Sequence, residues 1–154
     1  AVVCAGVKSI LDIRLTLEVL ETHGVPVVGY GTDRLPAFFA GDSGFGVDAR
    51  LDTPAQIARA LQAQWAMGLR GGMVIANPVP EAHALPRAVI DAAIEAALAD
   101  AAVQGITGKA VTPFLLARVN ELTGGNSLAA NIALILNNAR LAAAVAGELA
   151  RLGA

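Results

Sequence analysis

Apolar runs and stretches of helical spacing alternate along the first half of the chain. Short apolar runs over residues 1–5, 25–30 and 72–76 predict three buried strands. Between these runs, apolar residues recur every three to four positions, which predicts helices over residues 9–22 and 54–68. Strands that alternate with helices in this way are typical of a parallel sheet with right-handed crossovers.

The first predicted helix carries an apolar stripe. Leu11, Leu15 and Val19 are each four residues apart, so they share one helix face. Ser9 is the expected N-cap, and Gly24 is expected to end the helix.

Residues 31–52 are polar and rich in glycine, and we expect them to be too irregular to contribute to the core. Thr53 follows this stretch as an expected N-cap, and Pro54 suits the first position of the second helix.

From Pro86 onward the pattern predicts helix almost throughout. The expected helices cover residues 86–104, a segment opened by Thr112-Pro113 and stopped at Thr123, and residues 127–152. Three strands make a thin sheet for so much apolar helix, so we expect more of the sheet to lie in sequence outside this chain.

The predicted fold class is therefore α/β, in α/β/α layers, with a mainly parallel sheet and a helix-rich C-terminal part. Residues 1–154 are interpreted as a single domain or as the C-terminal portion of a larger one. The chain begins with Ala1 in mid-strand and without an initiator Met, which is compatible with a genuine start and with a piece of a larger protein.

Composition narrows the expected partners. The chain is 55% apolar with a net charge of −2, so no basic stripe for nucleic acid is expected. No apolar run reaches the roughly 18 to 20 residues without charges that a membrane span needs, so no membrane is expected as a partner. A lone cysteine, Cys4, excludes an internal disulfide and fits the cytoplasm, and its place in an apolar strand favours a packing role.

Lys8 is the first candidate for chemistry. It lies just past the carboxyl end of the first predicted strand, at the sheet edge where ligands bind in open α/β folds. Apolar neighbours would remove part of its water shell, lower the pKa of the amine and make it a usable nucleophile. The alternative is a surface lysine that precedes a helix and keeps its amine in water.

Polar residues also follow the other two predicted strands, and in a parallel sheet we expect them to converge with Lys8 on one pocket. These residues are Tyr30, Thr32, Asp33, Asn77, Glu81 and His83. Each has a structural alternative: Asp33 as a loop cap, Asn77 as a strand terminator, and His83 as a solvated loop residue.

The last predicted helix carries Ser127, Asn131 and Asn138 along one side of an otherwise apolar surface. A planar amide offers a donor and an acceptor together, which suits the edge of a nucleobase. Hydrogen bonding within the fold is the alternative. No P-loop, no dinucleotide fingerprint and no metal-ligand spacing of His, Cys or carboxylates is present.

Five blocks along the chain resemble one known family. They are VCAGVKSILD (3–12), GVPVVGYGT (24–32), ANP (76–78), GKAVTPFLL (108–116) and TGGNSLAANIAL (123–134). These blocks are similar, in order, to the pseudouridine-5′-phosphate glycosidases, also called indigoidine-synthase-A-like proteins.

The resemblance implies an enzyme that reversibly cleaves the carbon–carbon glycosidic bond of pseudouridine 5′-phosphate to uracil and ribose 5-phosphate. It implies that Lys8 is the nucleophile that forms a Schiff base with the sugar. It also implies that Asn131, in the SLAAN block, lies at the base-binding site.

The chain resembles only the C-terminal half of this family. The family's acidic proton donor, its second substrate lysine and the aspartate that binds manganese belong to the other half, so this chain supplies the nucleophile half. The resemblance further implies a manganese cofactor, a homotrimer and a cytoplasmic protein. The alternatives are a non-catalytic domain for sugar-phosphate binding or assembly, and a Schiff-base lyase or aldolase that acts on another sugar phosphate.

Overall fold

The structure is a computed structural model that describes residues 1–8 and 11–153. Its strands are β1 (Val2–Cys4), β2 (Val27–Tyr30), β3 (Ala49–Leu51) and β4 (Val74–Ala76). Its α-helices are α1 (Ile13–Thr22), α2 (Pro54–Ala66), α3 (Arg87–Val103), α4 (Val111–Leu122) and α5 (Asn126–Leu152). Two short 3₁₀ helices, η1 (Glu81–His83) and η2 (Gly108–Ala110), precede α3 and α4.

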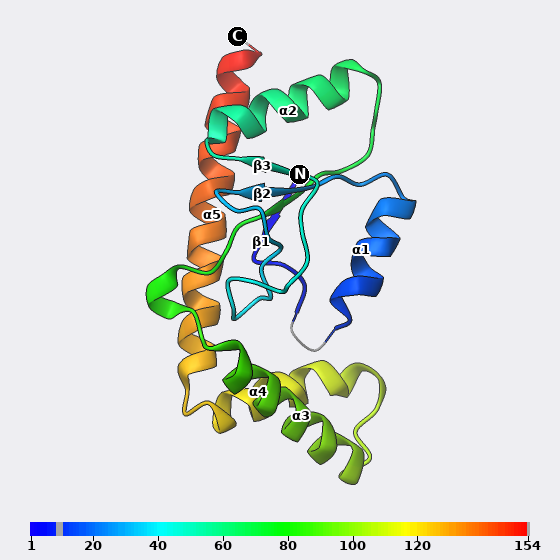
Figure 1. The fold of residues 1–154 in the computed structure, drawn as a ribbon, viewed down its shortest axis with the longest axis vertical. Coiled ribbons are helices and arrows are strands. Elements are labelled where there is room, and N and C mark those ends of the chain that lie inside the picture. Colours follow the sequence, from blue (N-terminus) through cyan, green and yellow to red (C-terminus); the bar gives the residue numbers. More distant parts are fainter. Residues whose placement is uncertain (9–10, 154) are drawn as a thin grey trace.

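The described strands form one parallel sheet in the order β1-β4-β2-β3 (Figure 1). Ile75 of the central strand β4 is in register with Val3 on one side and with Val28 on the other. The chain runs from β1 past the β4 position to β2 and β3, and then returns to β4. Because crossovers are right-handed, this reversal puts α1 and α2 on opposite faces of the sheet.

Side chains alternate between the two faces along each strand. Val28 and Ile75 pack in a cluster with Leu61 of α2 and Leu141 of α5. The neighbouring Val27 belongs to a second cluster, which α1 covers. The sheet therefore lies between helices on both sides, and the predicted α/β class with α/β/α layers is confirmed.

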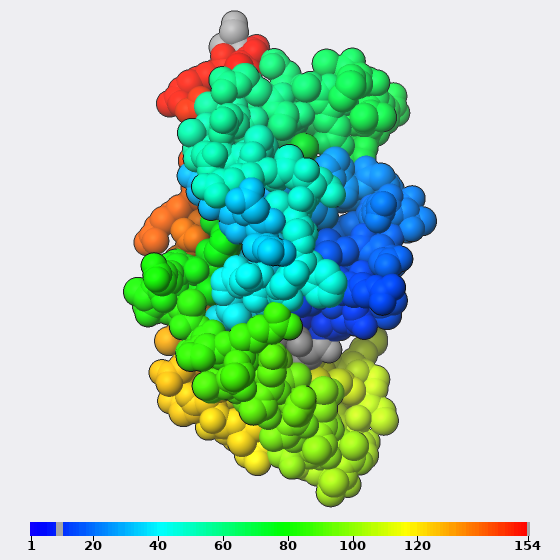
Figure 2. Space-filling view, viewed as in Figure 1, coloured from blue at the N-terminus to red at the C-terminus, as the bar shows by residue number. Residues whose placement is uncertain are grey.

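Residues 31–52 correct one prediction, since this stretch was expected to lie outside the core. Leu35, Phe39 and Ala40 are buried, and β3 forms at the end of the stretch. The segment occupies the middle of the face seen in Figure 2, coloured cyan. The strand escaped prediction because it is short, lies at the sheet edge and has the exposed Arg50 at its centre, so it shows no apolar alternation.

Helix α1 begins later than predicted, at Ile13, because Asp12 caps it by accepting a hydrogen bond from the backbone N–H of Leu15 at 2.9 Å. The expected cap Ser9 lies outside the described residues. The apolar stripe is on the surface, since Leu15 and Val19 are 62% and 55% exposed. A different set of residues faces the sheet: Ile13, Leu17 and Leu20.

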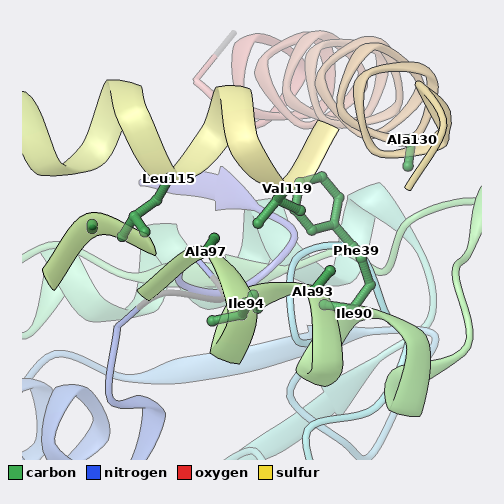
Figure 3. Packing of buried hydrophobic residues seen from close by; sticks show 9 residues of the cluster. Phe39, Ile90, Ala93, Ile94, Ala97, Leu115, Val119 and Ala130 are labelled. Carbon is green, nitrogen blue, oxygen red and sulfur yellow. The ribbon is translucent and has the colours of Figure 1, made fainter. Parts of the chain in front are cut away.

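The helices from α2 onward follow the predicted pattern. Thr53 forms a capping box with Gln56 at the start of α2. Helices α3 and α4 form a pair around Ile94, Leu115 and Val119 (Figure 3). Phe39 packs into the same cluster and joins this pair to the loop of residues 31–52.

Helix α5 is long and apolar enough to span a membrane by length and composition, the one such helix in the described part of the chain. This is weak evidence, because core helices of other folds pass the same test. Leu134, Leu141 and Val145 are the large apolar residues that α5 buries, and they pack against the sheet region and α2. The helix runs along most of the long axis of the molecule and contacts β1 on its way (Figure 1).

Candidate functional site

Lys8 lies on the turn between β1 and α1, and this turn is held by the loop of residues 31–52. Gly6 has a φ of +88°, and a Cβ added there would lie 1.9 Å from the carbonyl oxygen of Pro36. The backbone N–H of Phe38 donates to the carbonyl of Ala5 at 2.8 Å. Glycine is therefore required two residues before Lys8, where the backbone approaches the loop most closely.

The Lys8 side chain is exposed. The backbone carbonyl of Lys8 accepts a hydrogen bond from the N–H of Leu11 at 2.8 Å. Within residues 1–8 and 11–153, the amine has neither an ion-pair partner nor a hydrogen-bond partner. The burial expected from its apolar sequence neighbours is therefore not provided by these residues. No carboxylate of the described residues pairs with the amine, which leaves it open to a reactant on their side.

Asn77 joins three elements at the same edge. It follows β4 directly, is only 4% exposed, and its backbone N–H donates to the Cys4 carbonyl of β1 at 2.8 Å. Its side-chain Nδ2 donates to Oδ1 of Asn138 on α5 at 3.0 Å. One residue before Asn138 on α5, Nδ2 of Asn137 donates to the carbonyl of Pro78 at 3.1 Å.

Asn131 is brought to this edge by the packing of α5. Leu134, three residues further along and so on the same side of the helix, packs in one cluster with Ala5 and Val79. Asn131 itself is half-buried, and its amide has no hydrogen-bond partner in the part of the chain that the structure describes. The edge thus carries an amine on the β1 turn and an amide on α5 that no other described side chain or backbone group pairs with.

The other two residues of the predicted polar line are used within the fold. Asn138 bonds Asn77, as above, and Ser127 is buried against α4. The Ser127 hydroxyl and the Leu128 N–H both donate to Oδ1 of Asn120, at 3.4 and 3.2 Å. For Ser127 and Asn138 the structural alternative is therefore correct.

The polar residues after β2 make contacts of their own, away from Lys8. The prediction that all three strand ends converge on one pocket is therefore wrong for the end of β2. Asp33 pairs with Arg50 at 3.1 Å, and Asp52 and Asp33 together raise the pKa of that guanidinium. The hydroxyl of Thr32 bonds within a local turn, and Tyr30 packs against the cluster under α2 and α5.

Glu81 and His83 lie on η1, and both are exposed. Neither side chain has a hydrogen bond to another described residue. Burial raises the pKa of the half-buried Cys4 thiol, against the smaller opposing effect of a hydrogen bond from the Gly6 backbone, and this disfavours the reactive thiolate.

Two hollows lie near these elements without including Lys8 or Asn131 in their walls. One, of about 460 Å³, lies at the amino end of β2 between Glu21 and Asp48. The other, of about 250 Å³, lies beside the start of α1 and is flanked by Arg14 and Arg87. Arg14 and Arg87 each form an ion pair with a carboxylate, so the second hollow has no unpaired arginine to bind a phosphate. The first hollow has no arginine or lysine in its wall.

Comparison with known proteins decides the family. Residues 1–148 match the family described as "Indigoidine synthase A like protein". The chain belongs to this family. It is 66% identical over 148 residues to the pseudouridine-5′-phosphate glycosidase of Hahella chejuensis, covering 96% of this chain and 49% of that protein. It is 58% identical over 151 residues to the enzyme of the same name from Escherichia coli K12, covering 98% of this chain and 48% of that protein.

Solved structures of related proteins share the fold. The prealnumycin C-glycosynthase AlnA, solved in complex with ribulose 5-phosphate, superposes with a TM-score of 0.88 at 40% identity over 97% of this chain and 49% of its own. An indigoidine synthase A-like protein from Thermotoga maritima superposes with a TM-score of 0.84 at 37% identity, over 94% of this chain and 47% of its own. The chain thus spans about half the length of the relatives that it matches.

The described residues of this indigoidine synthase A-like chain contain no group of three or more His, Cys, Asp or Glu side chains able to hold a metal ion. The resemblance places the aspartate that binds manganese in the half of the family that this chain does not match, so manganese stays an expectation for the full-length protein.

Sequence reasoning missed the contact between Asn77 and Asn138. Both residues stood out separately, Asn77 because it follows a predicted strand and Asn138 because it lies on the polar side of an otherwise apolar helix. Their pairing depends on which strand α5 crosses, and periodicity does not contain that information.

Proposed function

We propose that this chain supplies the nucleophile half of a pseudouridine-5′-phosphate glycosidase, with Lys8 as the catalytic lysine and Asn131 as a contact to the base. The observation that carries the proposal is the unpaired Lys8 amine at the carboxyl edge of the sheet, in a chain 66% identical to a protein of that name. The AlnA complex with ribulose 5-phosphate supports a sugar phosphate as the substrate class.

The reaction needs an electron sink because the bond to be broken joins two carbons. The unprotonated Lys8 amine adds to the anomeric carbon of the sugar, and the ring oxygen leaves and takes up a proton. The nitrogen lone pair then forms the imine as the carbon–carbon glycosidic bond breaks. The electron pair of that bond stays with the uracil carbon, which takes a proton. Water hydrolyses the imine, releasing ribose 5-phosphate and restoring the lysine.

Asn131 would hold the pyrimidine while this bond breaks. Its amide offers one acceptor and two donors, which matches the alternating carbonyl and N–H groups of a uracil edge. The group that protonates the uracil carbon is not assigned to any residue of this chain. Manganese binding, a homotrimer and a cytoplasmic location enter the proposal as expectations for the full-length protein, and no step above depends on them.

The test uses the small number of lysines, because Lys8 and Lys109 are the two in the sequence. The protein is incubated with ribose 5-phosphate and borohydride, and the reduced adduct is measured by intact mass and located by peptide mapping. The test is run on this chain and on a version that spans the full length of its curated relatives. Lys109→Ala is the matched control, since Lys109 is exposed on η2, which packs against α4.

An adduct on Lys8 that Lys8→Ala abolishes and Lys109→Ala preserves supports the imine mechanism. Release of uracil from pseudouridine 5′-phosphate by the full-length version then separates a glycosidase from an aldolase. Absence of an adduct in both versions would refute the role of Lys8 and favour a binding or assembly domain.

A further inference from the structure

We infer that Asn77 and Asn138 form a positioning pair, which fixes α5 against the sheet so that Asn131 stays at the same edge as Lys8. This inference rests on the proposed function, because it concerns how the two proposed site residues are held relative to each other.

One residue connects all the elements that carry the site, through its backbone and its side chain. Asn77 follows β4, bonds the end of β1 through the Cys4 carbonyl, and bonds α5 through Asn138. Asn138 is seven residues beyond Asn131, which is two helical turns or about 10 Å along the same side of α5. Sliding α5 along its axis by a fraction of a turn would therefore break the Asn77–Asn138 hydrogen bond and displace Asn131.

A buried amide is a costly way to obtain stability alone. An apolar side chain of similar size would fill the space at position 77 without leaving a donor that needs a partner. Apolar contacts such as Ala5 with Leu134 tolerate small shifts, whereas a hydrogen bond at 3.0 Å has one satisfactory geometry. The hydrogen bond between Asn77 and Asn138 thus fixes the position of α5 along its axis, which the apolar contacts of α5 with the sheet do not.

A second anchor lies on the other side of Asn131. Oδ1 of Asn120 on α4 accepts from the N–H of Leu128 in the first turn of α5, where Gly125 supplies no capping side chain. Asn131 therefore lies between two hydrogen-bonded points, one turn after the first and two turns before the second.

The test compares Asn138→Leu with Asn138→Asp in the version that spans the full length of the relatives. Aspartate keeps an acceptor oxygen for the Asn77 amide, and leucine of similar size removes it. Two quantities are measured: the KM for uracil in the synthetic direction, and the rate at which ribose 5-phosphate forms the trapped Lys8 adduct. Ile94→Val in α3 is the control for a loss of stability away from the edge.

Asn138→Leu should raise the KM for uracil about tenfold while the rate of Lys8 adduct formation changes less than about twofold. Asn138→Asp should stay within about threefold of wild type in both quantities. Ile94→Val should lower the unfolding temperature and change neither. Equal losses in both quantities for Asn138→Leu, or an unchanged KM, would overturn the positioning role.

A distance measurement decides the same question if the wild-type protein forms no adduct and releases no uracil, which would refute the proposed function. Spin labels at the exposed positions Leu11 and Ile135, in a Cys4→Ala background, report where α5 lies relative to the Lys8 turn. Asn138→Leu should shift or broaden the distance distribution, and Asn138→Asp should restore it. An identical distribution in all three proteins would overturn the inference.

Discussion

Asp48 and Val27 form a reciprocal pair at the start of β2. The Asp48 carboxylate accepts a hydrogen bond from the backbone N–H of Val27 at 2.8 Å, and the Asp48 N–H donates to the Val27 carbonyl at 2.9 Å. The Asp48 side chain thus takes the place of a backbone acceptor beside β2. This holds the end of the loop of residues 31–52 in register for β3, which starts at the next residue.

Replacing this carboxylate should lower stability modestly. Asp48→Ala leaves the Val27 N–H without its acceptor, and we expect the free energy of unfolding to fall by about 1 kcal/mol. Asp48→Asn retains an acceptor oxygen and should lose less than half of that. Urea unfolding at constant pH measures both, and equal losses in the two variants would show that the charge, not the hydrogen bond, matters.

Gly6→Ala should damage both the fold and the site. The added Cβ would lie 1.9 Å from the Pro36 carbonyl oxygen, and the φ of +88° is unfavourable for alanine. We expect a loss of at least about 3 kcal/mol in the free energy of unfolding. Lys8 adduct formation should also slow, because the turn that carries Lys8 must move.

Gly24→Ala is the matched control for this substitution. Gly24 also has a positive φ, +62°, but a Cβ there meets no atom within 4 Å. The expected loss is about 1 kcal/mol, from backbone conformation alone, with adduct formation unchanged. Similar losses for Gly6→Ala and Gly24→Ala would mean that the loop yields at Pro36.

Lys8→Arg separates charge from nucleophilicity. Arginine keeps the positive charge and the long side chain, but its guanidinium does not form an imine with a sugar. Because Lys8 is exposed and unpaired in the described structure, thermal unfolding should be unchanged while the borohydride-trapped adduct disappears. Retention of the adduct at another site in Lys8→Arg would contradict the assignment.

The Cys4 thiol should resist alkylation until high pH. Burial raises its pKa, so the folded protein keeps the thiol protonated at pH values where an unfolded chain has begun to ionise. Stability should therefore fall as pH rises above the ordinary range of a thiol and toward the raised pKa. Iodoacetamide labelling measures the reactivity, and Cys4→Ala should remove this part of the pH dependence of unfolding.

Much of the fold could be predicted because its strongest signals are local. The apolar runs that became β1, β2 and β4 and the Thr53 cap of α2 depend on neighbours in sequence. Strand β3 could not be predicted, since its hydrogen bonds to β2 arise from a loop whose conformation depends on the assembled sheet. The burial of Phe39 was hidden for the same reason, because its partners are on α3 and α4.

For the candidate site, too, the local features could be predicted from the sequence and the long-range contacts could not. The position of Lys8 after a strand and the polar side of α5 are visible in the sequence. Which strand ends meet is set by the sheet order, and β4 lies between β1 and β2. Asn77 therefore lies beside the Lys8 turn and contacts α5, whereas Asp33 pairs with Arg50 away from it.

The central place of β4 also governs the order of assembly during synthesis. Among the described strands, β1 pairs with β4 alone, so this pairing forms only after the residues near Ile75 have been synthesised. Asn138 must then emerge before α5 can close the edge. A nascent chain halted ahead of α5 would expose the Lys8 turn without its helix, so we expect this edge to be among the last parts of the segment to become resistant to protease on the ribosome.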